Sequence, residues 1–137
     1  MDRTGEHAVK PTACAALAVA LLVLTTACTA EEALPPGDVA HYAPEGPGGD
    51  AAQLIGQLER LDGCVYVVVP GPDGRTVPVF PDDPAIRWDG ETLLAASLAL
   101  PLGEQVELGG GEGSAGSDSI SVPEACDPDA PLFIVNS

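Results

Sequence analysis

The sequence predicts an all-β fold, a small antiparallel barrel or sandwich of about six to seven short strands. Its clearest sign is the run 63–71 (GCVYVVVPG), where β-branched and aromatic residues lie between chain-breaking residues. A second sign is the clean alternation of 103–108 (GEQVEL), which is typical of a strand with one solvent-exposed face. Turn signals such as Asp73-Gly74 and Asp89-Gly90 interrupt the short apolar runs. We therefore expect strands that are joined by tight turns.

The run that begins at Cys64 has two apolar faces. Alternation along a strand places every second side chain on the same face. Since neither face is polar, we expect a central strand that is covered on both sides. The two faces carry, respectively, Cys64, Tyr66 and Val68, and Val65, Val67 and Val69.

Residues 1–27 have the layout of a signal peptide. Arg3 and Lys10 precede 13–27, a run of about fifteen residues without a charged side chain. This run is shorter than the ~20 residues that a membrane-spanning helix needs. An uncleaved anchor stays open as an alternative, because the uncharged stretch also includes Pro11 and Thr12.

The segment Leu24-Thr25-Thr26-Ala27-Cys28 resembles the lipobox of bacterial lipoproteins. The resemblance implies that Cys28 is lipidated and becomes the mature N-terminus, which places the protein on the extracytoplasmic face of the cell membrane. Thr26, Ala27 and Cys28 match the pattern, and Thr25 stands where the family usually has leucine. Ordinary cleavage after Ala27 or Ala30 is the alternative and would give a secreted protein.

The cysteine count favours lipidation and predicts one disulfide. Cys14 leaves with the signal peptide, and Cys28 is consumed by its anchor. Cys64 and Cys126 then remain as a pair in an oxidising compartment, so we expect them to be bonded. The alternative is two buried free thiols.

The remaining chain divides into a tether and a domain. Residues 28–50 are rich in Pro, Gly and acidic side chains, and we expect a disordered linker in which His41 and Tyr42 are solvated. Residues 51–137 form the predicted β domain. Its architecture is expected to be OB-like or similar.

Within the domain, two segments are ambiguous. Residues 53–59 favour a strand with a bend at Gly56, although 51–61 would also suit a short helix. The Ala- and Leu-rich segment 91–100 suits a helix or two strands joined at Ala96-Ser97. The other expected strands are 75–80, at an edge or bulged because of Pro78, then 103–108, 120–123 and 132–135, while 109–119 is expected to be mobile.

Four segments of the domain, taken together, resemble a group of small secreted or lipid-anchored bacterial proteins, common in actinobacteria. These segments are 63–66, 77–81, 103–111 and 123–126. The resemblance implies a compact β domain with strand pairs at 91–100, and it supplies no catalytic residue. The group has no established function.

Charge restricts the class of partner. The chain has 21 acidic and five basic residues, which gives a formal net charge of −16. Loss of the signal peptide leaves this charge unchanged, because Asp2, Glu6, Arg3 and Lys10 cancel. Such a surface repels phosphate backbones, so nucleic-acid binding is not expected.

No catalytic, metal or cofactor site follows from the sequence. We expect a non-enzymatic, monomeric binding or structural module with a cell-envelope ligand of unknown identity. The alternative is a Ca²⁺-dependent module that uses the loop 82–91, and a small hydrolase is more distant. Burial of Tyr66, Phe80 and Trp88 would favour a packed core over a ligand-binding face. The candidate Ca²⁺ ligands are Asp82, Asp83, Asp89 and Glu91, with Asp127 and Asp129 as a weaker pair.

Overall fold

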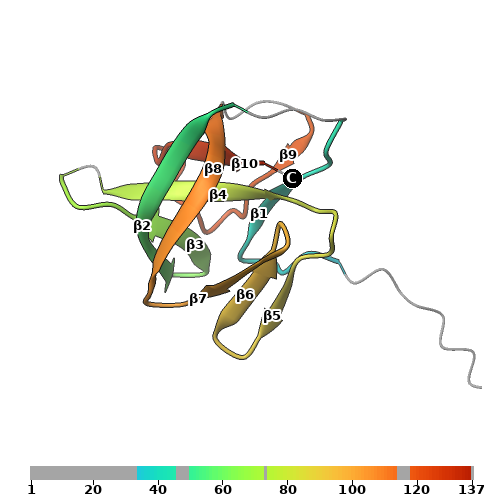
Figure 1. Cartoon of the computed structure of the whole chain (residues 1–137), viewed down its shortest axis with the longest axis horizontal. Helices are drawn as coiled ribbons and strands as arrows, with labels where there is room; N and C mark the ends of the chain where they lie inside the picture. The colour runs from blue at the N-terminus through green and yellow to red at the C-terminus, as the bar shows by residue number, and fades with distance from the viewer. Residues whose placement is uncertain (1–33, 46–49, 73, 114–117, 137) are drawn as a thin grey trace, which may run out of the picture.

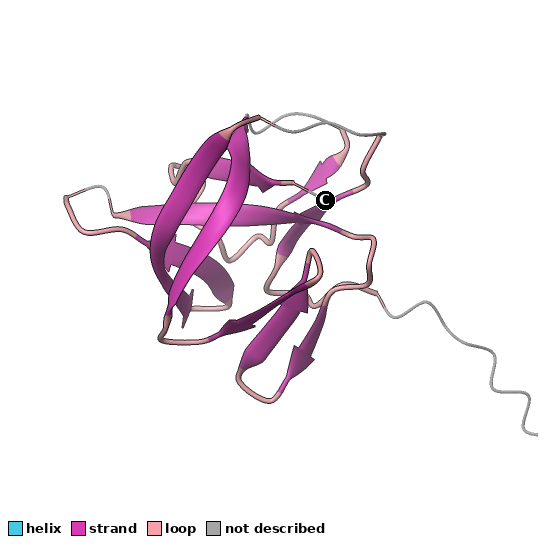
Figure 2. Ribbon diagram, in the orientation of Figure 1, coloured by secondary structure: helices cyan, strands magenta, loops and turns pink. Residues whose placement is uncertain are grey.

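The computed structural model describes residues 34–45, 50–72, 74–113 and 118–136 (Figure 1). This part of the chain holds ten strands and no helix, so the predicted all-β class is confirmed (Figure 2). The strands are β1 (Ala40–Tyr42), β2 (Ala52–Leu61), β3 (Cys64–Val68), β4 (Arg75–Pro81), β5 (Arg87–Asp89), β6 (Thr92–Ala95), β7 (Leu98–Pro101), β8 (Gln105–Gly113), β9 (Ile120–Ser121) and β10 (Leu132–Val135). The predicted signal peptide lies outside the described residues.

Five of these strands close into a barrel. Around it, the neighbours are β2, β3, β4, β10 and β8, and β8 pairs with β2 again. Every pair is antiparallel except β4 with β10, which run parallel. Counted along the chain, the barrel strands follow the order 1-2-3-5-4, which is that of an OB-like Greek-key barrel. Figure 1 shows β2 and β8 side by side with β4 running across them.

The strand β3 separates two apolar clusters, as the alternation predicted. Val65 and Val67 face the barrel interior, and Cys64 and Tyr66 face a second cluster on the outside of β3 and β4. Side chains from β1 and from the segment that leads into β10 complete this outer cluster. It consists of Ala40, Cys64, Tyr66, Val77, Val79, Cys126 and Leu132.

A separate three-stranded sheet, β5–β6–β7, packs against the barrel interior. It is inserted between β4 and β8 and contributes Leu93, Ala95 and Leu100 to the interior cluster, together with Ile86, which directly precedes β5. The ambiguous segment 91–100 therefore forms two strands, with Ala95 paired to Leu98. The turn between them places Ala96 and Ser97 at φ values of 49° and 61°.

The expected linker 28–50 contains strand β1, so the predicted disorder was wrong for Ala40–Tyr42. Strand β1 pairs in parallel with β4 and antiparallel with β9. Val39 and Ala40 are 1% and 2% exposed, and the hydroxyl of Tyr42 donates a hydrogen bond to the Val135 carbonyl at 2.7 Å. Val39 joins the interior cluster and Ala40 joins the outer cluster, and the nearby prolines and glycines do not prevent three residues from pairing.

The glycine run after Leu108 is also more ordered than predicted. Strand β8 continues to Gly113, and residues 110–113 pair with β10. A Cβ at Gly110 would clash with the carbonyl oxygen of Ile134. Glycine therefore permits the close approach of β8 and β10 that closes the barrel.

Strand β4 lies inside the sheet, although Pro78 predicted an edge or a bulge. Arg75 and Thr76 pair with β3, whereas residues 79–81 pair with β1. Pro78 lies where β3 gives way to β1 on one side of β4, and on the other side it is in register with Phe133 of β10. The Val77 amide donates toward β10, to the Pro131 carbonyl, so the next amide position, at Pro78, faces the side where neither β3 nor β1 pairs with it.

Candidate functional site

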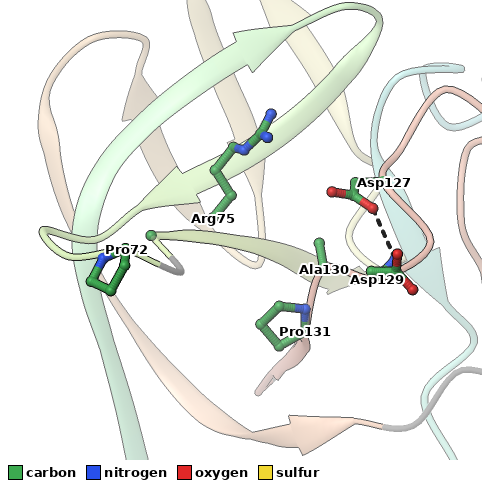
Figure 3. Close-up of a pocket in the computed structure, with 7 residues that line it drawn as sticks. Pro72, Arg75, Asp127, Asp129, Ala130 and Pro131 are labelled. Atoms are coloured by element: carbon green, nitrogen blue, oxygen red, sulfur yellow. Dashed lines mark hydrogen bonds between the residues drawn. The ribbon is translucent and has the colours of Figure 1, made fainter.

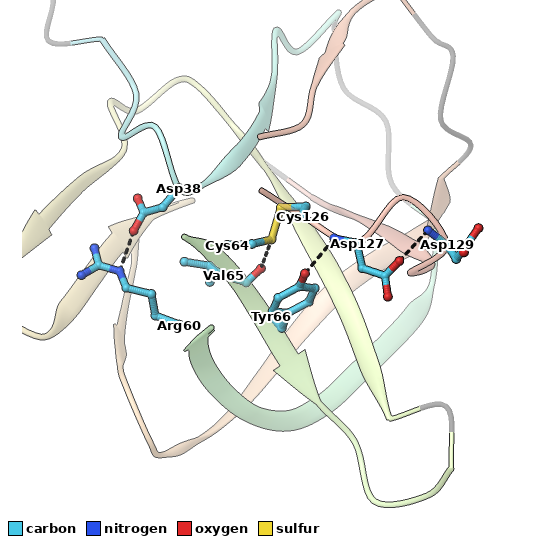
Figure 4. The surroundings of a disulfide bond; sticks show 8 residues. All are labelled: Asp38, Arg60, Cys64, Val65, Tyr66, Cys126, Asp127 and Asp129. Atoms are coloured by element: carbon cyan, nitrogen blue, oxygen red, sulfur yellow. Dashed lines mark hydrogen bonds and ion pairs between the residues drawn. A yellow bond between two sulfur atoms is a disulfide. The ribbon is translucent and has the colours of Figure 1, made fainter. Parts of the chain in front are cut away.

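A buried disulfide is the centre of the outer cluster (Figure 4). Cys64 and Cys126 are bonded across 62 positions, with their Cα atoms 5.0 Å apart. Cys64 is fully buried, and Cys126 is 6% exposed. The predicted disulfide is confirmed, and it holds the segment before β10 against β3.

Tyr66 is next to this disulfide and connects three segments. Its side chain is 3% exposed, and its hydroxyl accepts a hydrogen bond from the Asp127 backbone N–H at 2.8 Å. The guanidinium carbon of Arg75 lies 5.5 Å from the centroid of the Tyr66 ring. Because Tyr66 is fixed by packing, it positions both Arg75 and the chain at Asp127.

A pocket opens where these segments meet (Figure 3). Its volume is about 250 Å³, and it lies between the β3–β4 loop and the turn that precedes β10. Figure 3 shows Arg75 on one side and the two aspartates on the other. The lining residues are Pro72, Gly74, Arg75, Asp127, Asp129, Ala130 and Pro131.

The charged groups of this pocket are not paired with one another, and the Asp127 carboxylate is held by a hydrogen bond. The Oδ1 atom of Asp127 accepts a hydrogen bond from the Asp129 backbone N–H at 2.9 Å. Within the described part of the chain, the one ion pair joins Arg60 to Asp38, so neither aspartate is within ion-pair distance of Arg75. The pocket therefore presents a cation and two carboxylates to solvent.

A second pocket of about 400 Å³ has a neutral lining. Gln57 and Gln105 contribute amides, and Gln57 donates a hydrogen bond to the Gly103 carbonyl at 2.5 Å. Gly56 forms its floor, and a Cβ there would lie 2.5 Å from the Val68 carbonyl oxygen. This pocket offers two amides, a glycine backbone and the apolar side chains of Val68 and Pro70 to a ligand, and no charged group.

Trp88 belongs to a cluster that ties the N-terminal segment to both sheets. The indole N–H donates to Asp38 Oδ1 at 3.1 Å, and Arg60 Nε lies 2.5 Å from Asp38 Oδ2. The Arg60 guanidinium also stacks on the Trp88 ring, 4.1 Å from its centroid. Since Tyr66 and Phe80 are buried and Trp88 is engaged here, the three aromatic side chains form no open binding face.

The acidic loop 82–91 receives no geometric support as a Ca²⁺ site. Asp83, Asp89 and Glu91 are exposed, and Asp82 is partly buried. Among the residues that the structure describes, no group of three or more histidine, cysteine, aspartate or glutamate side chains is arranged to hold a metal ion. The structure does not bring the four predicted ligands together.

The predicted lipidation site, Cys28, lies outside the described residues. In the ranges 34–45, 50–72, 74–113 and 118–136, no helix has the length and apolar character needed to cross a bilayer.

Sequence reasoning missed Arg75 as a site residue and gave little weight to Asp127 and Asp129. A usable signal was present, because the predicted disulfide places the residue after Cys126 near the strand that holds Tyr66. No family model matches this chain, and no match was found among the curated proteins or the solved structures compared with it.

Proposed function

We propose that this protein is a lipid-anchored, extracytoplasmic module that binds a small ligand and catalyses no reaction. The buried disulfide is the observation that carries the proposal. Disulfides between distant cysteines form and persist in oxidising compartments, so this bond supports export of the chain. An exported chain with Cys28 after a signal-like run is a substrate for lipid attachment.

The charged pocket supports a binding role. It is formed by two segments that the disulfide and Tyr66 hold together, so its two walls are in place before a ligand arrives. A pocket whose backbone is already ordered loses less freedom on binding, which favours affinity. The proposal therefore assigns ligand binding to the pocket and stabilisation of the pocket to the disulfide.

A non-enzymatic role is supported by the side chains available. Beyond the signal peptide the sequence has no lysine, and its single histidine, His41, lies in β1. Histidine is the most frequent general acid–base group in enzymes, and histidine or lysine often activates a nucleophile. The charged pocket is lined by an arginine and two aspartates and by neither histidine nor lysine.

Lipidation is tested by mass spectrometry of the mature N-terminus from a bacterial host that processes lipoproteins. We expect a diacylglyceryl-modified cysteine at Cys28 and recovery of the protein with membranes. A Cys28→Ser variant should lose the lipid and leave the membrane fraction. An unmodified N-terminal peptide that starts at Cys28 or Glu31 would contradict the proposal.

A further inference from the structure

Arg75 is placed to receive a carboxylate. Its guanidinium lies over the buried Tyr66 ring, and within the described part of the chain it has no ion-pair partner. A guanidinium that stacks through its face keeps its N–H donors free at the edge. Such an edge matches the two oxygens of a carboxylate, which makes a bidentate, charge-assisted contact.

Asp127 and Asp129 are placed to receive a cation. Asp127 follows the disulfide-bonded Cys126, and its backbone N–H is fixed by Tyr66. Its Oδ1 atom already accepts the Asp129 N–H, whereas Oδ2 and the Asp129 carboxylate accept no hydrogen bond from the residues that the structure describes. These oxygens can accept hydrogen bonds from an ammonium group.

The positive and negative groups of the pocket lie apart, and this separation indicates which kind of ligand the pocket can bind. Arg75 and the two aspartates line one pocket, yet they do not neutralise each other. A simple anion at Arg75 would be repelled by the two carboxylates of the pocket, and a simple cation at the aspartates would be repelled by the guanidinium. A ligand with one charge of each sign satisfies both sides of the pocket.

The dimensions of the pocket limit the ligand. Its volume of about 250 Å³ is below the range of about 300–1,000 Å³ that is usual for drug-sized ligands. Pro72, Ala130 and Pro131 supply short, rigid walls without long flexible side chains. The pocket thus suits a molecule of the size of an amino acid or a dipeptide.

We propose that this pocket binds an amino-carboxylate, a free amino acid or a short peptide in its zwitterionic form. The ligand carboxylate contacts Arg75, and the ligand ammonium contacts Asp127 and Asp129. This inference rests on the proposed binding function and specifies its ligand class.

The test uses glycylglycine as the probe, because it carries both charges and has no stereochemistry. The full chain, labelled with ¹⁵N, is titrated while amide resonances are followed by NMR. We expect shifts at Arg75, Asp127 and Asp129, with a Kd of about 1 mM or tighter. N-acetyl-glycylglycine, which lacks the ammonium, and glycylglycinamide, which lacks the carboxylate, should each bind at least about tenfold more weakly.

Variants assign the two charges. Arg75→Gln and Asp127→Asn should each weaken glycylglycine at least about tenfold, and Arg75→Lys should retain part of the affinity. Asp127→Asn keeps an oxygen that can accept the Asp129 N–H, so the turn is preserved. Arg87→Gln, the same change at an exposed arginine in β5, should leave the affinity unchanged.

Several results would overturn the inference. Equal affinity for glycylglycinamide would show a cation site, and equal affinity for the acetylated peptide would show an anion site. Unchanged affinity of the Arg75→Gln variant for glycylglycine would refute the zwitterion site. The absence of resonance shifts in the parent at 10 mM glycylglycine would refute it as well. If the binding tests fail but Cys28 is lipidated, the ligand class is refuted and the proposed membrane anchoring stands. If glycylglycine binds as expected but Cys28 is not lipidated, the ligand class stands and the proposed membrane anchoring is refuted.

Discussion

Individual side chains in this protein join segments that are distant in the sequence. Asp38 contacts both Arg60 and Trp88, so one carboxylate links the N-terminal segment to β2 and β5. Tyr66 similarly links β3 to the chain at Asp127. Each of these contacts closes a loop of the chain. The chain entropy that is lost when such a loop closes is modest.

Tyr42 gives a pH-dependent prediction. Its hydroxyl donates to Val135, and burial raises the pKa of the phenol above its ordinary value of 10.0. The unfolded chain therefore loses this proton first, so the stability that Tyr42 contributes is present below pH 10 and is lost as the pH rises above it.

The measurement compares the parent with Tyr42→Phe by thermal melting between pH 7 and pH 11. At pH 7 the variant should be less stable by about 1 kcal/mol, because the Val135 carbonyl loses its donor. The difference should shrink above pH 10. A constant difference across this range would show that the hydroxyl does not ionise with unfolding.

At the level of elements, two hairpin turns use different residues for the same backbone. Asp62-Gly63 and Ala96-Ser97 each join paired strands with two residues, and all four residues have positive φ. Asp-Gly is a favoured sequence for such a turn, whereas Ala-Ser carries two Cβ atoms in the left-handed region. The β6–β7 turn is therefore strained relative to the β2–β3 turn.

Replacing Ala96-Ser97 by Asn-Gly should stabilise the protein by about 1 kcal/mol, since both new residues tolerate positive φ. Urea unfolding of the two proteins measures the difference. The matched control is Gly63→Ala, which should cost a similar amount at the other turn. An Asn-Gly variant no more stable than the parent would show that the turn is not strained.

The pattern of residues along the chain was sufficient to predict those strands whose own alternation determines which face is buried. The alternation at Cys64–Val69 predicted both clusters around β3, and Val106 and Leu108 are buried while Glu107 is exposed, as expected. Strand β1 escaped prediction because it has only three residues and its stability comes from β4 and β9. The pocket escaped because Arg75 and Asp127 meet only through the packing of Tyr66.

Taken as a whole, the domain combines a small barrel with one long covalent loop. The interior cluster and the outer cluster are both modest, and the disulfide spans most of the barrel sequence. A bond that closes a loop of this length restricts the unfolded chain strongly. Small domains gain much of their net stability from such constraints.

A Cys64→Ala/Cys126→Ala variant should be destabilised by about 4 kcal/mol, which is the chain-entropy value for a 62-residue separation. Denaturant unfolding of parent and variant gives the difference. Reductant should lower the stability of the parent and leave the variant unchanged. A variant as stable as the oxidised parent would show that the bond adds nothing to stability.

Removal of the N-terminal strand provides a second test at this scale. A chain that begins at residue 51 lacks Val39 and Ala40 and leaves Phe80 and Pro81 of β4 without a strand partner. Loss of the buried valine alone should cost about 2 kcal/mol. The melting temperature of the chain that begins at residue 51 should therefore fall well below that of a chain that begins at residue 34. Equal melting temperatures would restore the linker interpretation of residues 34–50.

The position of β1 also sets a geometric limit on reach. In the lipid-anchored form that we propose, Asp38, where the chain is already fixed by Arg60 and Trp88, lies ten positions after Cys28. Ten fully extended residues span at most about 35 Å. The barrel would thus stay close to the bilayer surface, and it could bind only those ligands that approach the membrane to within this distance.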